Sequence, residues 1–367
     1  MKKECDINPS TGRLQESFMY IDLGSVVKGR LNNPRKIDKT DAPSRAQRIL
    51  SENDIIFQCV RPYQMNNYIF KGFNDKSQWV ASTGYAQLRT ANNNPEYIYF
   101  LLNSPQFNKK VILECTGSNY PAINSEDLSK IPFYKSSSTI EQEKIAHILL
   151  LLDQRITTQN KIIEDLKKLK SAIVENEFLR IEGKEPLGNY VKLQGGYAFK
   201  SAEFKAEGMP LIRISNLSQD SNRVDMRDCV FYKEGNYSNY IISKGMLLIA
   251  MSGATTGKTA IYTEEKSAYL NQRVGCFRSS KIYYPYLYVV VESSMFKNQL
   301  NTKLIAGAQP NISSADIESI IVPIPTYSIQ NHIAKEAVSL DKKILIEFQL
   351  LCLYTQEKRY LLQQMFI

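Results

Sequence analysis

Histidine is almost absent from this chain, and its cysteines are scattered. The 367 residues include two histidines and six cysteines, and no two cysteines form a CxxC pair. Zinc sites need closely spaced cysteine and histidine ligands, so we expect no metal site. Isolated cysteines are typical of a cytosolic protein with reduced thiols, and we expect a cytoplasmic location.

Long apolar runs are also missing. The longest uninterrupted aliphatic stretch covers residues 148–152, whereas a membrane-spanning helix needs about 20 apolar residues. The first residues, MKKECD, lead into no apolar segment, so no signal peptide is expected. The sequence therefore predicts a protein without a membrane partner.

Enzyme motifs are the third absence. The chain has no Pro-Pro dipeptide, which excludes the Asn/Asp-Pro-Pro-aromatic motif of adenine methylation, and no glycine-rich cofactor loop follows a predicted strand. The stretch IAMSGATTGKTAIY (249–262) resembles a P-loop, but only three residues separate Gly253 from Gly257 where a P-loop has four. A hairpin with glycines in a tight turn is the simpler interpretation. We expect no catalytic residues and no bound cofactor.

Basic charge is present, and it is concentrated in two regions. The net charge is +9, with 18 basic and 13 acidic residues in 1–138, and 16 and 13 in 181–326. The other segments, 139–180 and 327–367, carry 7 and 7, and 5 and 4. Basic globular regions favour a polyanionic partner, although many other proteins share such an excess.

The two nearly neutral segments repeat each other at an offset of 188 residues. IEQEKIAHILLLLDQRI (140–156) aligns with SIQNHIAKEAVSLDKKI (328–344), so that Gln142 matches Gln330 and Leu152-Asp153 matches Leu340-Asp341. Shorter matches follow in the globular regions. The repeat predicts four segments: a globular region at 1–138, a helix at 139–180, a globular region at 181–326 and a helix at 327–367.

Both predicted helices carry apolar residues at heptad spacing, which favours a coiled coil. Ser138 and Glu141 have the spacing of a capping box at the start of the first helix. Gln159, Lys170, Glu347 and Lys358 interrupt the seam at matched positions; they either fix the register or are partly exposed. The residues predicted to pair the helices are Ile145, Leu149, Leu152, Ile156, Gln159, Ile163, Leu166, Ile333, Leu340, Ile344, Glu347 and Leu351.

The globular regions read as mixed α/β domains. Strands are predicted at 55–57, 211–214 and 247–249, because these short apolar runs are bounded by turn residues. Short amphipathic helices are predicted at 95–112 and 284–300. The fold class expected from this pattern is α+β, with two mixed domains separated by two long helices.

Polar and basic loops recur at matched positions of the two globular regions. Arginine and glutamine can bond base edges bidentately, and hydroxyl and ammonium groups suit phosphates. For any one of these residues a solvated loop is the simpler explanation, but the recurrence in both copies favours recognition. The candidates in the first region are Arg45, Arg48, Arg61, Tyr63, Gln64, Lys71, Ser118, Asn119 and Tyr120. Those in the second are Ser252, Thr255, Thr256, Lys258 and Gln309.

Several longer segments, in this order, resemble the specificity subunits of type I restriction-modification systems over the full chain. They are SRAQRILSENDIIFQCVRPYQMNN (44–67), LLLLDQRITTQNKIIEDLKKLKSAI (149–173), GGYAFKSAEFKAEGMPLIRISNL (195–217), LLIAMSGATTGKTAIY (247–262), YLNQRVGCFR (269–278) and GAQPNISSADIESIIVPIPTYSIQNHIA (307–334). The resemblance adds Tyr197 and Lys200 to the DNA-binding candidates. A counterpart of 196–200 is missing before Tyr20.

The resemblance implies a non-enzymatic subunit that binds double-stranded DNA. Each globular region would be a target-recognition domain that reads one half of a split sequence, and the antiparallel helices would set the gap between the halves. The helices would also dock two modification subunits, which carry the methyltransferase chemistry, and restriction subunits would join that core. S-adenosylmethionine, ATP and magnesium are then expected only in the partner subunits. The alternatives are a fused methyltransferase or nuclease that acts alone, and a coiled-coil adaptor without a DNA role.

Overall fold

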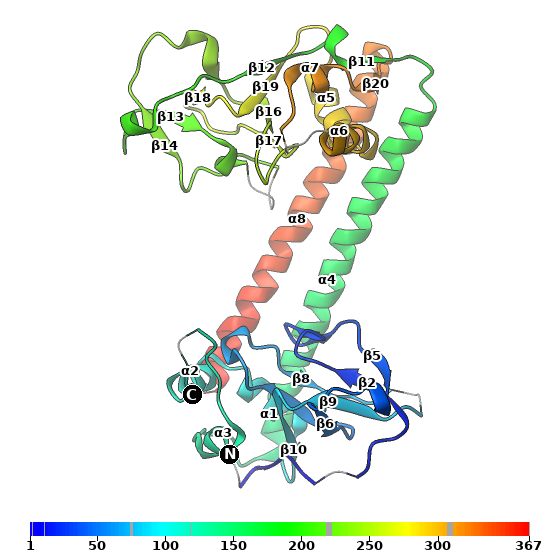
Figure 1. Cartoon of the computed structure of the whole chain (residues 1–367), viewed down its shortest axis with the longest axis vertical. Helices are drawn as coiled ribbons and strands as arrows, with labels where there is room; N and C mark the ends of the chain where they lie inside the picture. The colour runs from blue at the N-terminus through cyan, green and yellow to red at the C-terminus, as the bar shows by residue number, and fades with distance from the viewer. Residues whose placement is uncertain are drawn as a thin grey trace. The chain divides into compact units, whose positions relative to one another are not determined.

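The chain divides into two compact units. The computed structural model describes residues 1, 3–10, 12–73, 76–117, 119–217, 222–306 and 311–366. Unit 1 comprises residues 1–161 and 348–367, and unit 2 comprises residues 162–347. Each unit therefore contains one globular region and part of each long helix (Figure 1). In the described part of the chain no helix is long and apolar enough to cross a membrane.

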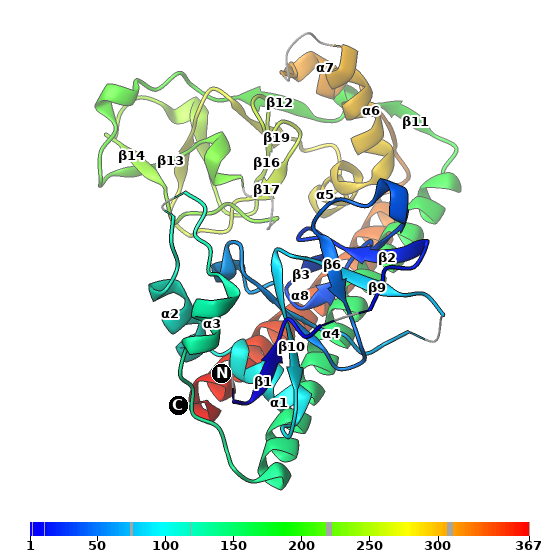
Figure 2. The ribbon, with the colours of Figure 1, turned by 60° about the horizontal axis from the view of Figure 1, so that its bottom comes forward.

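The globular part of unit 1 is built from two four-stranded sheets and short helices. The sheet orders are β1-β10-β7-β8 and β5-β2-β9-β6, and β3 pairs with β4. Strands β2, β6 and β9 lie side by side (Figure 2). The strands are β1 (Cys5–Ile7), β2 (Ser17–Ile21), β3 (Val26–Val27), β4 (Arg30–Leu31), β5 (Arg35–Asp38), β6 (Ala46–Ile49), β7 (Ile55–Gln58), β8 (Tyr68–Ile69), β9 (Trp79–Ser82) and β10 (Tyr85–Thr90). The short helices are α1 (Pro95–Leu102), α2 (Pro105–Leu113) and α3 (Ser125–Lys130).

The globular part of unit 2 has the same plan. Its sheet orders are β12-β19-β16-β17 and β14-β13-β18-β15, and β11 pairs with β20. The strands are β11 (Lys184–Pro186), β12 (Lys192–Gly195), β13 (Met209–Ile212), β14 (Val230–Tyr232), β15 (Ile241–Ile242), β16 (Leu247–Ala250), β17 (Thr259–Ile261), β18 (Ala268–Leu270), β19 (Val274–Arg278) and β20 (Ile321–Pro323). The short helices are α5 (Tyr284–Glu292), α6 (Ser294–Ala306) and α7 (Ser314–Glu318).

The internal repeat extends to the strand pairing. In each unit one sheet is antiparallel, and the other contains one parallel pair, β2 with β9 and β13 with β18. The edge strand β1 pairs with β10 as β12 pairs with β19. The first unit thus has the counterpart of β12, although no sequence match to 196–200 was found before Tyr20. The predicted pair of mixed α/β domains is confirmed.

The central strands β7 and β16 are largely apolar because both of their faces are covered. In β16, Leu247 and Ile249 contact one core, while Leu248 and Ala250 contact another. Successive side chains of a strand point to opposite faces, so a strand between two cores has no polar alternation. β7 is divided in the same way, with Ile56 on the opposite face from its neighbours.

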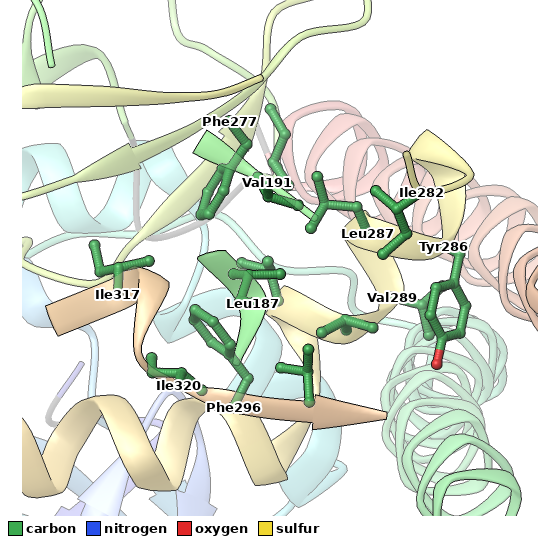
Figure 3. Packing of buried hydrophobic residues seen from close by; sticks show 14 of the residues in the cluster. Leu187, Val191, Phe277, Ile282, Tyr286, Leu287, Val289, Phe296, Ile317 and Ile320 are labelled. Carbon is green, nitrogen blue, oxygen red and sulfur yellow. The ribbon is translucent and has the colours of Figure 1, made fainter. Parts of the chain in front are cut away.

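The largest core of unit 2 lies where the short helices cover the sheet (Figure 3). Phe277 of β19, Leu187, Leu287 and Phe296 belong to this cluster. Phe178 and Ile333, from the two long helices, belong to the same buried cluster. The long helices are therefore part of the hydrophobic core of each globular region, and not only a connection.

Two predicted elements differ in detail. The strand predicted at 211–214 ends at Ile212, because the Asn216 side chain accepts a hydrogen bond from the Arg213 N–H (2.9 Å) and turns the chain. The segments 95–112 and 284–300 each contain two helices. Each break lies at a serine, Ser104 or Ser293, whose hydroxyl caps the next helix.

The long helices are α4 (Thr139–Leu179) and α8 (Tyr327–Met365). The Ser138 hydroxyl accepts a hydrogen bond from the Glu141 N–H (3.3 Å), so Ser138 caps α4 as its spacing predicts. Every residue predicted to pair the helices is buried or partly buried, whereas Leu151 and Leu345, off the seam, are exposed.

Two ion pairs show that the helices run antiparallel, as predicted. In unit 1, Lys358 near the end of α8 contacts Asp153 near the start of α4 (2.5 Å). In unit 2, Lys170 near the end of α4 contacts Asp341 near the start of α8 (2.6 Å). The two pairs are related by the repeat, because Asp153 matches Asp341 and Lys170 matches Lys358 at the offset of 188. Each seam lysine is thus compensated by a carboxylate of the other helix.

A buried glutamine near the start of each long helix holds the globular region. Gln142 accepts a hydrogen bond from the N–H of Asn94 (3.0 Å), the capping residue of α1. Its matched residue Gln330 accepts one from the N–H of Tyr283 (2.8 Å), the capping residue of α5. Each side-chain amide also donates to a backbone carbonyl, Gln142 to that of Ser136 and Gln330 to that of Pro325. The glutamines recur in the sequence because both helix starts need this contact.

We expect Gln142→Ala to destabilise unit 1 by about 1–3 kcal/mol, because it leaves buried backbone groups without a partner. Trp79 is the only tryptophan of the chain and lies in β9 of unit 1, so its fluorescence during urea unfolding reports on this unit. Gln154→Ala, at an exposed position of the same helix, should change stability by less than about 0.5 kcal/mol. Equal effects of the two substitutions would contradict the anchoring role.

We expect Asp341→Lys to lower stability by about 1–3 kcal/mol, because the half-buried pair lies between the ranges for exposed and buried ion pairs. Thermal melting followed by circular dichroism measures the loss. Adding Lys170→Asp should restore most of the stability, since the pair is then reversed and not removed. The control is Lys168→Glu, at an exposed pair with Glu164 on the same helix. A double variant that melts no higher than Asp341→Lys would argue against the pairing.

Candidate nucleic-acid interface

In unit 1, three loops that are distant in sequence meet just beyond the end of β7. The N–H of Cys59 donates to the carbonyl of Gly84 (3.0 Å), in the turn between β9 and β10. The carbonyl of Cys59 accepts from the N–H of Ile123 (3.0 Å), and the Arg61 N–H donates to the Pro121 carbonyl (2.8 Å). We call residues 59–64, 83–84 and 119–123 the loop junction of unit 1.

The same backbone contacts recur in unit 2. The N–H of Met251 donates to the carbonyl of Arg273 (2.9 Å), and the carbonyl of Met251 accepts from the N–H of Ile312 (3.0 Å). Ser252 and Asn311 form a β-bridge, as Val60 and Ala122 do in unit 1. Residues 251–258, 271–273 and 311–312 are the loop junction of unit 2. The matched contacts assign Cys59 to Met251 and Gly84 to Arg273.

Arg61 and Tyr120, two of the candidates in unit 1, are in direct contact. Arg61 has a left-handed backbone (φ 55°) and precedes a short 3-10 helix at Pro62–Gln64. Its guanidinium carbon lies 4.5 Å from the centre of the Tyr120 ring, which is 65% exposed. This cation–π contact holds the guanidinium at the surface while its N–H edge stays available. Gln64 and Asn119 are exposed in the same junction.

The stretch 249–262 is a β-hairpin in unit 2. β16 and β17 pair antiparallel, and the Gly257 N–H donates to the Ala250 carbonyl (2.8 Å) across the turn. Gly253 and Gly257 both have positive φ, 82° and 83°, a conformation that favours glycine. A P-loop passes from a strand into a helix, whose N-terminus binds the phosphates. Here the chain passes from a strand into a second strand, and no helix N-terminus follows the turn. The role of the two glycines is therefore to permit the turn.

The candidates in this hairpin differ in exposure. Ser252 is buried, and its hydroxyl accepts a hydrogen bond from Nη1 of Arg273 (3.0 Å). Thr255, Thr256 and Lys258 are half-buried. The Thr256 hydroxyl donates to the Gly253 carbonyl (2.6 Å), so this hydroxyl stabilises the turn. Ser252 therefore contacts another side chain of the junction, whereas Thr255 and Lys258 lie at its surface.

The other candidates of unit 1 lie at or outside the junction. The carbonyl of Arg45 accepts from the Thr83 N–H (2.8 Å), which places Arg45 beside the turn at Gly84. Burial lowers the pKa of Arg48, whose Nε is buried without a hydrogen-bond partner. Lys71 forms an ion pair with Glu96 of α1 and is not part of the junction. Ser118 lies outside the described residues.

In unit 2, Tyr197 lies next to the junction, because its N–H donates to the carbonyl of Leu270 (2.9 Å), just before the turn at 271–273. Its ring packs against Tyr237 and Tyr240, with centroids 5.2 and 5.3 Å away. Lys200 is exposed, and Gln309 lies outside the described residues.

Sequence reasoning missed Arg273, Tyr237 and Tyr240. Arg273 lies inside the segment YLNQRVGCFR (269–278), which is part of the family resemblance. Its position directly before β19 was the available signal. A residue just outside a buried strand belongs to a surface loop, and binding residues are often found on such loops. The tyrosines follow no spacing that would have identified them.

The acidic, histidine and cysteine side chains of the described residues bear on metal and thiol chemistry. Among the described residues no group of three or more histidine, cysteine, aspartate or glutamate side chains could hold a metal ion. Cys59 is the cysteine of the unit 1 junction, and burial raises the pKa of its thiol to about 12. A thiol with such a pKa stays protonated at neutral pH and is a poor nucleophile.

Two regions of the chain match one family model. Residues 20–168 and 184–351 each match the type I restriction modification DNA specificity domain. The chain belongs to this family. Each match covers a globular region with its loop junction and continues into the long helix that follows. The specificity-domain repeat is therefore the same repeat that the strand orders show.

Two curated relatives of this chain are named specificity subunits of type I restriction enzymes. The MjaVIII specificity subunit of Methanocaldococcus jannaschii is 29% identical over 234 residues, 56% of this chain and 55% of that protein. The HindI specificity subunit of Haemophilus influenzae is 24% identical over 167 residues, 44% of this chain and 36% of that protein. The chain thus matches about half, or about a third, of the length of these relatives.

Solved structures agree in fold. A type I restriction-modification S subunit from M. genitalium superposes with a TM-score of 0.63 at 17% identity, covering 100% of this chain and 94% of that one. A chain from a structure of a type I restriction-modification system gives 0.61 at 16% identity, covering 98% and 92%. At these identities the similarity concerns the fold alone.

Proposed function

We propose that this chain is the sequence-specific DNA-binding subunit of a type I restriction-modification complex. Each unit reads one half of a bipartite target in double-stranded DNA through its loop junction. The observation that carries this proposal is the match of both globular regions to the DNA specificity domain. The relatives are named specificity subunits of type I restriction enzymes, which agrees with this role.

The composition of the junctions supports DNA as the ligand. Guanidinium, amide, hydroxyl and ammonium groups converge there, and these groups bond base edges and phosphates. The basic excess of the chain lies in the two globular regions, so the attraction of DNA would act where the junctions lie. A bipartite target follows from the repeat, because two equivalent junctions on one chain bind two separate stretches of sequence.

The long helices would hold the gap between the half-sites and bind the partner subunits. Their outer faces expose large apolar side chains, including Leu169, Ile346, Phe348, Leu353 and Tyr360, each at least 49% exposed. Apolar groups at such positions favour contact with other proteins over contact with water. Two modification subunits would dock there, and restriction subunits would join them.

The catalytic chemistry would reside in those partners. S-adenosylmethionine would bind to the modification subunits, and ATP and magnesium to the restriction subunits, while this chain binds no cofactor and acts as a non-catalytic subunit. The complex would work in the cytoplasm, where the DNA of the cell lies.

Mapping of methylated adenines in the host genome tests this function. Deletion of the gene should abolish methylation at one bipartite motif, and complementation should restore it, because recognition by this chain directs the modification subunits. A catalytically inactive modification subunit serves as the control and should give the same loss. A methylation pattern that is unchanged by the deletion would refute the proposal.

We expect Lys258→Ala to weaken DNA binding and to lower its dependence on salt concentration. Loss of one phosphate contact should reduce the slope of log K against log [salt] by about 0.9. Titrations of a labelled duplex at several salt concentrations measure the slope. Lys266→Ala is a matched control, since Lys266 is exposed, lies beyond the other end of β17 and donates to the Gly208 carbonyl. Unchanged binding across the salt series would rule out the contact.

A further inference from the structure

At two matched positions of the loop junctions, the two units carry an arginine and a glycine in swapped order. Directly after the matched positions Val60 and Ser252, unit 1 has Arg61 and unit 2 has Gly253. Both residues have a left-handed backbone, with φ of 55° and 82°. In unit 1, Gly84 directly precedes β10, and in unit 2 Arg273 takes the matched place directly before β19. Each junction therefore carries one arginine at these two places, but on a different loop.

In unit 1 the packing leaves no room for an arginine at the position of Gly84. A Cβ atom on Gly84 would lie 2.8 Å from Cδ1 of Leu23, so a side chain there would displace the leucine. On the other loop of unit 1, a non-glycine residue accepts the left-handed conformation at Arg61, which costs about 1–3 kcal/mol.

The two guanidinium groups have partners other than acidic residues in the described part of the chain. Among the described residues no carboxylate forms an ion pair with Arg61 or Arg273, whereas Arg227 of unit 2 is paired with Asp225. Instead, Arg61 rests on the face of Tyr120, and Arg273 bonds to the buried hydroxyl of Ser252. Both arrangements orient the guanidinium and leave its charge and most of its N–H groups for a ligand.

We propose that Arg61 and Arg273 each read the major-groove edge of a guanine, one in each half of the bipartite target. This inference rests on the proposed DNA-binding function. The N7 and O6 acceptors of guanine match the paired N–H donors of a guanidinium, the commonest specific contact between arginine and a base. Ser252 is a positioning residue, because its hydroxyl is buried and acts through Arg273. The exchange of loops places the two guanidinium groups differently on their junctions, so the guanines lie at different positions within the two half-sites.

Parallel selection from a duplex pool with random positions tests the proposal with the full chain. Wild type should select a bipartite sequence with a fixed guanine in each half. Arg273→Lys should lose the preference for one of these guanines by about fivefold to a hundredfold, because the ammonium group of lysine lacks the rigid planar pair of donors that a guanidinium presents. The other half of the selected sequence should stay the same. Arg61→Lys should show the reverse pattern, and Ser252→Ala should weaken the same guanine as Arg273→Lys to a smaller degree.

Arg180→Lys is the control, since Arg180 is exposed on the surface and paired with Glu177; it should select the wild-type sequence. Two results with the variants would overturn the inference while leaving the proposed function in place. One is an unchanged selected sequence with Arg273→Lys. The other is a uniform loss of affinity for every sequence with a lower salt slope, which indicates a phosphate contact. A wild-type chain that selects no sequence at all would overturn both the inference and the proposed function.

Discussion

The backbone of a single residue beyond each central strand holds the whole loop junction together. Cys59 and Met251 each donate their N–H to one loop and accept from another through their carbonyl. Buried backbone groups need partners, so the strand end can satisfy its own groups only by fixing the two loops that pass it. The strand itself is immobilised by cores on both faces. Side chains on these loops therefore start from a rigid frame.

A rigid frame explains how one fold can present different chemistry in its two copies. The backbone contacts of the junctions are the same, whereas the residues that project from them differ. Arg61 rests on an aromatic ring in unit 1, and Arg273 bonds to a hydroxyl in unit 2. Arg61, Tyr120 and Arg273 are not part of the cores, so substitutions at these positions change what the surface binds without disturbing the fold.

The long helices show the opposite tendency, since their key contacts are repeated residue for residue. The seam lysines pair with matched aspartates, and the buried glutamines accept hydrogen bonds from the residues that precede matched short helices. A lysine at a half-buried position without a carboxylate would be costly, and a carboxylate alone would be equally so. The two members of each pair therefore have to occur together, which accounts for their recurrence at a fixed offset.

Local signals in the sequence were sufficient for the framework. The heptad spacing predicted both long helices, Ser138 predicted the start of one of them, and the apolar runs predicted the central strands. These features depend on neighbouring residues, through helix periodicity, capping and burial on both faces. The helix breaks at Ser104 and Ser293 were missed, because a serine inside an amphipathic segment can also be tolerated within a helix.

The site was decided by contacts between distant residues. Lys71 looks like a free basic residue in the sequence, but it is paired with Glu96, 25 positions away. Ser252 looks like a surface hydroxyl, but it is buried against Arg273, 21 positions away. The sequence by itself determined the repeat, the helices and the loops that carry polar residues, since these follow from local patterns. Only the tertiary structure decided which of those residues face outward, because side-chain partners depend on how the strands bring separate loops together.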